Sequence, residues 1–103
     1  MFPIRDFVKR FEEILAELDA LADACGAEAA EDLEDLNAEL EDALLLVSEL
    51  KMEDGREELS GALEDLAALA GDYRALADDI PGLDALAERL ERVAETALGA
   101  LKA

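Results

Sequence analysis

The sequence predicts an all-α protein: an antiparallel up-down-up-down four-helix bundle that forms one domain over residues 1–103. Apolar residues recur at alternating spacings of three and four, which is typical of helices packed on other helices. Alanine and leucine dominate the hydrophobic residues, whereas the β-branched residues that favour strands are few. Three breaks in the pattern separate the helices that we expect at about 3–25, 27–53, 56–79 and 82–101.

The first predicted helix, residues 3–25, can begin at Pro3, because the first helical turn does not use the N–H that proline lacks. Its broad apolar stripe indicates a helix that faces two neighbours, as in a bundle. We expect Gly26 to end the helix in the left-handed conformation. Cys25 is the only cysteine, and we interpret it as a small buried apolar residue. A reactive thiol is the weaker alternative, because the chain has no histidine to activate it.

The second predicted helix, residues 27–53, combines the two dominant features of the chain, an apolar stripe and a dense set of acidic residues. The positions between the apolar residues are almost all Asp or Glu. Acidic side chains in the first turn complement the positive end of the helix dipole, but further along the helix they mainly repel one another. The predicted apolar stripe consists of Leu33, Leu36, Leu40, Ala43, Val47 and Leu50.

The third predicted helix, residues 56–79, is expected to start at a capping box formed by Asp54 and Glu57. Its apolar register passes through Gly71 unchanged, which favours one continuous or bent helix. Tyr73 falls on the core side, so its hydroxyl group needs a hydrogen-bond partner or a place at the edge of the bundle.

The fourth predicted helix, residues 82–101, follows Pro81, which cannot continue the third helix but can open the next one. The connections are only a few residues long, so sequential helices must lie antiparallel. Two alternatives stay open: a three-helix arrangement, and helical hairpins that complete a core only on dimerising. The predicted stripe of this helix consists of Leu83, Leu86, Leu90, Val93, Ala97 and Ala100.

The net charge of -19 argues against nucleic acid and anionic membranes as direct partners, because a strongly negative surface repels both. Three interpretations remain. The acidity can serve solubility alone, including adaptation to high salt, and this is the commonest use of an acidic helix surface. It can also attract a basic protein. Finally, it can imitate the phosphate backbone of a nucleic acid and so occupy a protein that binds one.

The charge is concentrated in residues 27–55, which hold eleven acidic residues against a single base, Lys51. This segment therefore carries about half of the net charge of the chain. We predict that one side of the bundle is strongly negative. The residues chosen for this candidate acidic face are Glu31, Asp32, Glu34, Asp35 and Glu39.

A second candidate site on the same helix is apolar. With Ala43 and Val47 pointing inward, Leu45 points outward and Leu46 lies on the flank. An apolar strip of this kind is typical of a helix that contacts another copy or a partner, although a merely broad core face is an equal alternative. The candidate interface consists of Leu44, Leu45, Leu46 and Met52.

The sequence provides no catalytic residue, cofactor site or metal site. It has no histidine, and no phosphate-binding or dinucleotide-binding glycine motif is present. Acidic pairs one turn apart could hold a hydrated Ca²⁺ or Mg²⁺ loosely, but no segment has the ligand spacing of a calcium loop. A solvated acidic face is the favoured interpretation.

These observations predict a non-enzymatic protein that acts through protein–protein interaction, with no small-molecule substrate identified. We expect a homodimer formed through the second helix. The alternative is an acidic chaperone, inhibitor or nucleic-acid mimic that binds a basic partner protein. The longest apolar run, Ala43–Val47, is too short to cross a bilayer, and the first six residues lack a signal peptide's apolar region. We therefore expect a soluble, cytoplasmic protein.

Overall fold

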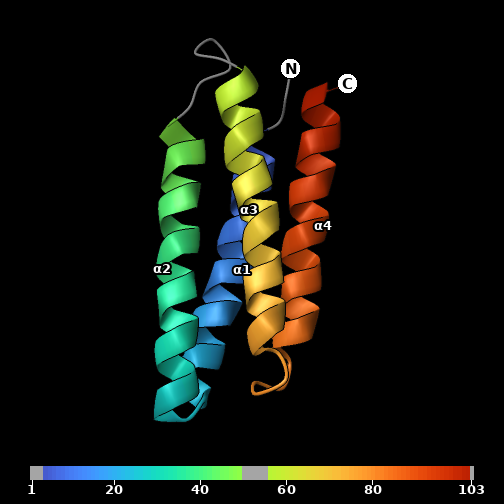
Figure 1. Ribbon diagram of the computed structural model, residues 1–103. Helices are drawn as coiled ribbons and strands as arrows, with labels where there is room; N and C mark the ends of the chain where they lie inside the picture. The colour runs from blue at the N-terminus through green and yellow to red at the C-terminus, as the bar shows by residue number, and fades with distance from the viewer. Residues whose placement is uncertain (1–3, 50–55, 103) are drawn as a thin grey trace.

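In the part of the chain that the structure describes, four α-helices run alternately up and down and form the bundle expected from the sequence (Figure 1). The structure, a computed structural model, describes residues 4–49 and 56–102. Both ends of the described chain lie at the same end of a molecule that measures 43 × 20 × 18 Å (Figure 1). The helices are α1 (Ile4–Ala24), α2 (Ala27–Glu49), α3 (Arg56–Leu76) and α4 (Leu83–Lys102).

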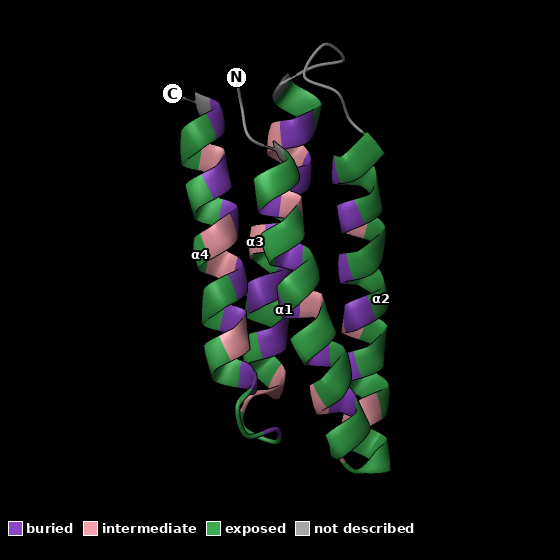
Figure 2. Cartoon of the chain, turned by 180° about the vertical axis from the view of Figure 1, so that it is seen from behind, coloured by how far each residue is buried: buried purple, intermediate pink, exposed green. Residues whose placement is uncertain are grey.

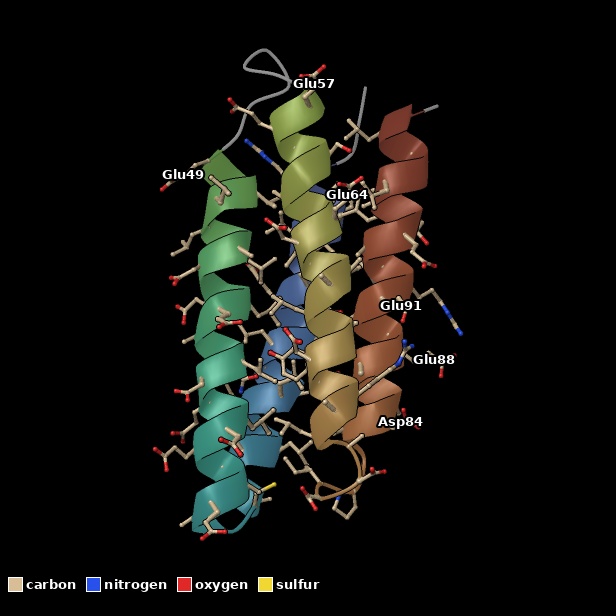
Figure 3. All side chains as sticks on the ribbon, in the orientation of Figure 1. Glu49, Glu57, Glu64, Asp84, Glu88 and Glu91 are labelled. Atoms are coloured by element: carbon tan, nitrogen blue, oxygen red, sulfur yellow. The ribbon has the colours of Figure 1, made fainter. Side chains whose placement is uncertain are left out.

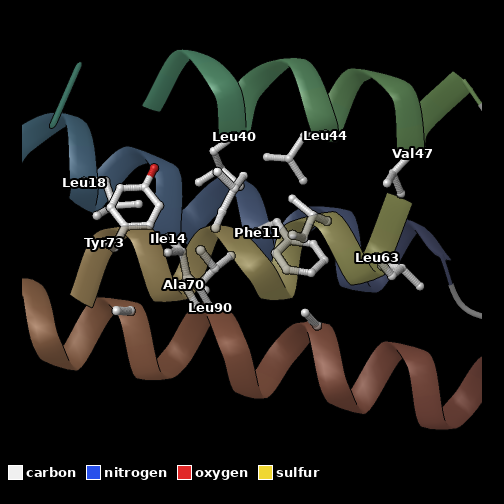
Figure 4. Packing of buried hydrophobic residues seen from close by; sticks show 14 of the residues in the cluster. Phe11, Ile14, Leu18, Leu40, Leu44, Val47, Leu63, Ala70, Tyr73 and Leu90 are labelled. Carbon is white, nitrogen blue, oxygen red and sulfur yellow. The ribbon is translucent and has the colours of Figure 1, made fainter. Parts of the chain in front are cut away.

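The helices are arranged as a ring in which each one packs against two neighbours. α1 contacts α2 and α4, and α3 contacts the same two helices, while the described residues make no close contact across the diagonals. The three-helix alternative is therefore wrong. Buried apolar side chains from all four helices meet in one core, so no second copy is needed to complete it (Figures 2 and 4). α2 and α4 lie at opposite edges of the molecule.

The most extensive helix contact is that between α3 and α4, and small residues make it possible. α4 buries Ala87, Ala94 and Ala97 against the core, whereas the larger Leu86 and Val93, which we expected on the stripe, are only half-buried. Alanine allows two helix backbones to approach closely, and its small side chain leaves few gaps at such a contact. The correction to the predicted stripe is thus a rotation of α4 that places its alanines toward the core.

α2 is also rotated from the orientation predicted by its leucines. Leu36 and Ala43 are only half-buried, whereas Asn37 and Leu44 are fully buried. Buried Asn37 was not expected, because every core position assigned from the sequence was apolar. The observed buried face of α2 consists of Leu33, Asn37, Leu40, Leu44 and Val47.

A chain of hydrogen bonds across three helices accounts for this rotation. The Tyr73 hydroxyl of α3 donates to the Asn37 side-chain oxygen at 2.9 Å, and the Asn37 amide nitrogen donates to the Asp19 carboxylate of α1 at 3.0 Å. A carboxylate can only accept, so Asn37 must turn its NH₂ toward Asp19 and its oxygen toward Tyr73. Figure 4 shows the Tyr73 ring within the core and its hydroxyl directed toward α2. The expectation that Tyr73 is buried with a hydrogen-bond partner is confirmed.

The turn between α3 and α4 is built by Pro81 and Gly82. The Leu83 N–H donates to the Ile80 carbonyl at 3.2 Å, and Gly82 has a φ of 91°. Proline followed by a glycine with positive φ is the signature of a type II turn. Pro81 therefore lies in the turn, and the prediction that it opens the fourth helix is wrong. α3 ends at Leu76 rather than at residue 79.

Gly26 has a different role from the one predicted. Gly82 is the only described residue with a positive φ, so Gly26 does not form a left-handed cap. Its carbonyl instead accepts a hydrogen bond from the Ala30 N–H at 2.9 Å, which makes it the N-cap of α2. α3 runs through Gly71 without a break, as the apolar register indicated. The predicted cap at Asp54 lies outside the described residues.

We expect Tyr73→Phe to destabilise the fold by about 1–3 kcal/mol, because it leaves the buried oxygen of Asn37 without a donor. The double variant Asn37→Leu/Tyr73→Phe removes both polar groups and should recover most of this loss. Urea denaturation followed by circular dichroism measures both free energies. Equal stability of Tyr73→Phe and the unmodified chain would contradict a structural role for this bond.

Burial, with a smaller contribution from the negative charges of Asp19 and Glu39, raises the pKa of Tyr73 far above its usual value near 10. The stabilisation linked to the neutral phenol is therefore complete below pH ~10 and is lost as the pH rises through the higher pKa of the folded state. Tyr73 is the only tyrosine and there is no tryptophan, so tyrosinate absorbance reports on it directly. We expect the pH midpoint of the tyrosinate titration to be well above the midpoint measured for the urea-unfolded chain. Equal midpoints with intact helical structure would contradict the burial.

Candidate protein-binding site

The outer face of α2 is strongly acidic. Ala27–Glu49 carries nine carboxylates and no lysine or arginine, and all nine side chains are exposed. Figure 3 shows carboxylate-tipped side chains along the outer edge of this helix as far as Glu49. We call this set the α2 acidic face: Glu28, Glu31, Asp32, Glu34, Asp35, Glu39, Glu41, Asp42 and Glu49.

All five residues of the candidate acidic face predicted from the sequence are exposed, and the structure adds four more. The four additional residues lie on the exposed side of α2, opposite its buried side: Glu28, Glu41, Asp42 and Glu49. Projection of the sequence on a helical wheel would have found these four. Carboxylates follow one another at spacings of three and four, so they form rows with about 5.4 Å between successive turns.

The described ion pairs lie elsewhere in the bundle. Arg89 of α4 pairs with Glu17 of α1, Arg74 of α3 pairs with Glu91 of α4, and Arg92 pairs with Glu88 at 2.9 Å within α4. Among the described residues no carboxylate of α2 takes part in an ion pair. The molecule is therefore polarised, with an unneutralised acidic edge at α2 and a nearly balanced edge at α4.

Two large apolar residues interrupt the α2 acidic face. Leu45 is 54% exposed and Leu46 is 49% exposed, and they are the most exposed large apolar side chains among the described residues. Leu44, the third member of the predicted apolar interface, is only 5% exposed and belongs to the core. The prediction that Leu44 lines an exposed interface is therefore wrong, because the rotation of α2 turns it inward. Met52, the fourth member, lies outside the described residues.

A hollow of about 580 Å³ lies at the end of the bundle where α1 meets α2 and α3 turns toward α4. Its lining includes the carboxylates of Glu28, Asp32 and Asp79 beside the apolar Leu76 and Ile80. Nearby in sequence, Cys25 follows the end of α1 and is half-buried rather than fully buried as expected. The hollow is broad and open, and its lining contains no base or nucleophile that could work with the carboxylates.

Among the described residues, no group of three or more histidine, cysteine, aspartate or glutamate side chains is placed to hold a metal ion. None of the described helices is long and apolar enough to cross a membrane. No family model, curated protein or solved structure matches the chain.

Neighbouring leucines on α2 provide a matched test of the observed rotation. Leu44→Asp should unfold most of the bundle, because it puts an unpaired charge into the core. Leu45→Asp should change the free energy of unfolding by less than about 1 kcal/mol, because the side chain is half in solvent. Circular dichroism and light scattering on both variants check fold and mass. If Leu45→Asp unfolds and Leu44→Asp does not, the assigned rotation is wrong.

Proposed function

We propose that this protein is a non-enzymatic binding protein that captures a basic segment of another protein on the α2 acidic face. The observation that carries the proposal is the absence of any lysine or arginine from Ala27–Glu49, where nine exposed carboxylates lie. Such a face attracts cations from a distance and speeds the encounter with a basic partner. A chaperone, an inhibitor or a nucleic-acid mimic would each use it in this way.

Repulsion within the free protein supports the proposal. Carboxylates three or four residues apart, such as Glu31 and Asp35 or Asp35 and Glu39, destabilise a helix by about 0.2–0.5 kcal/mol per pair at low salt. A lysine or arginine from a partner relieves several of these repulsions at once. Binding of this kind weakens with ionic strength, because the Debye length shrinks from about 10 Å at 0.1 M to about 3 Å at 1 M.

Self-association through α2 is the second candidate, and the exposure of Leu45 and Leu46 favours it. In a symmetric dimer each copy buries its own two half-exposed leucines, which yields about 3–6 kcal/mol in total and little more than offsets the 4 kcal/mol or more that association costs in lost motional freedom. A symmetric contact would also bring two acidic faces together. A mass of twice 11.1 kDa that Leu45→Asp halves would support this candidate over the first.

The test of the proposal compares two charge-reversed proteins with equal net charge. The first replaces four carboxylates of α2 with lysine: Asp32→Lys, Glu34→Lys, Asp35→Lys and Glu39→Lys. The control replaces four exposed carboxylates outside α2 that take no part in the described ion pairs: Glu64→Lys, Asp65→Lys, Asp72→Lys and Glu95→Lys.

Binding of a lysine-rich synthetic peptide without helical periodicity is measured by fluorescence anisotropy at low and high salt. Reversal on α2 should weaken binding at least tenfold, because each surface ion pair contributes about 0.2–1 kcal/mol. The control should stay within about threefold of the unmodified chain. Equal losses in the two variants would mean that net charge alone attracts the peptide, and the proposal would then fail.

A further inference from the structure

We propose that the segment captured on α2 is an amphipathic basic helix, seated with its apolar residues on Leu45 and Leu46 and its cations on the carboxylates around them. This inference rests on the proposed function and specifies the partner's secondary structure and its pattern of side chains. It follows from three properties of the outer face of α2: the position of the leucines, the spacing of the carboxylates and the absence of a cation.

The leucines are embedded in the acidic face rather than set apart from it. Asp42 lies one turn before Leu45 and Leu46, and Glu49 lies one turn after them on the same outward side. Both leucines are about half exposed, and Glu41, Asp42 and Glu49 are exposed around them. A partner that covers the apolar pair must therefore also meet carboxylates on both sides.

The spacing of the carboxylates fits a helix better than an extended chain. Along the outer face, successive positions lie three or four residues apart, which gives a repeat of about 5.4 Å along α2: Asp35, Glu39, Asp42, the Leu45–Leu46 pair and Glu49. Lysine or arginine residues at the same spacing in an aligned helix keep this repeat over the whole length of α2. An extended segment presents side chains on one face every 6.6 Å or so, and it loses register by about 1.2 Å at each turn.

A second copy of this chain is a poor occupant of the same surface. Its own α2 would place carboxylates against carboxylates, with no lysine or arginine on either helix to separate them. The arginines of α4 are already engaged in ion pairs with Glu17 and Glu88. A contact between two α2 helices is therefore unfavourable, and a partner helix that brings its own cations complements this face.

The experiment uses two synthetic peptides of identical composition, rich in lysine and leucine, at concentrations where each is monomeric. In the first peptide, leucines recur at spacings of three and four between lysines, and the second is a scrambled isomer without that periodicity. The protein is compared with the double variant Leu45→Gln/Leu46→Gln, which keeps every carboxylate. Affinity is measured by fluorescence anisotropy, helix formation by circular dichroism, and mass by light scattering.

We expect the unmodified protein to bind the amphipathic peptide about tenfold more tightly than its isomer, with a gain of helix on binding. The double variant should bind both peptides within twofold of the affinity that the unmodified protein has for the isomer. Equal binding of the two peptides by the unmodified protein would overturn the helix inference and leave the proposed function standing. Failure to bind either peptide would overturn both. A dimer that the double variant abolishes would assign the leucines to a second copy and overturn the inference.

Discussion

The hydrogen-bonded chain from Tyr73 through Asn37 to Asp19 sets which side of α2 faces the core, and the outer surface of the protein depends on that setting. If Leu36 and Ala43 faced the core instead, α2 would be rotated about its axis by roughly 50°, which is half of the 100° between successive residues. Asn37 would then leave the core, and the Tyr73 hydroxyl would lose its acceptor. An unpaired buried hydroxyl costs about 1–3 kcal/mol, whereas burying the rest of the partly buried Leu36 gains no more than about 1 kcal/mol.

The same setting determines the candidate binding surface. It buries Leu44 and leaves Leu45 and Leu46 half exposed, and it points Asp42 and Glu49 outward beside them. One polar contact in the core thereby decides which apolar side chains a partner can reach. A buried polar pair of this kind contributes specificity more than stability, because an apolar pair of similar volume could fill the same space. In this protein the buried pair specifies the orientation of α2, and that orientation determines which side chains of α2 are on the surface.

The alternating spacing of three and four predicts that helices form and where they break, since that period and the turn residues are local properties of the chain. It does not predict the rotation of a helix when two adjacent positions can both face inward. In α2, either Leu36 or Asn37 can face the core, and the sequence favours the apolar Leu36. Only the hydrogen bond from Tyr73, 36 residues further along the chain, explains why Asn37 is the buried residue. In α4, Ala87 is fully buried and the larger Leu86 is only half-buried, because a closely packed core position favours the smaller side chain. Both outcomes depend on tertiary neighbours.

The uneven distribution of charge favours the proposed binding role over simple solubility. A net charge of magnitude about 2–8 is enough to keep a small domain soluble, and this chain carries -19. Acidic residues added for solubility gain nothing from being placed on one helix, where they repel one another most strongly. On α4, three bases (Arg89, Arg92 and Lys102) stand against four carboxylates, whereas α2 has no cation at all. The proposed cationic partner would account for this asymmetry, because it would stabilise the acidic α2 edge, which carries no cation of its own.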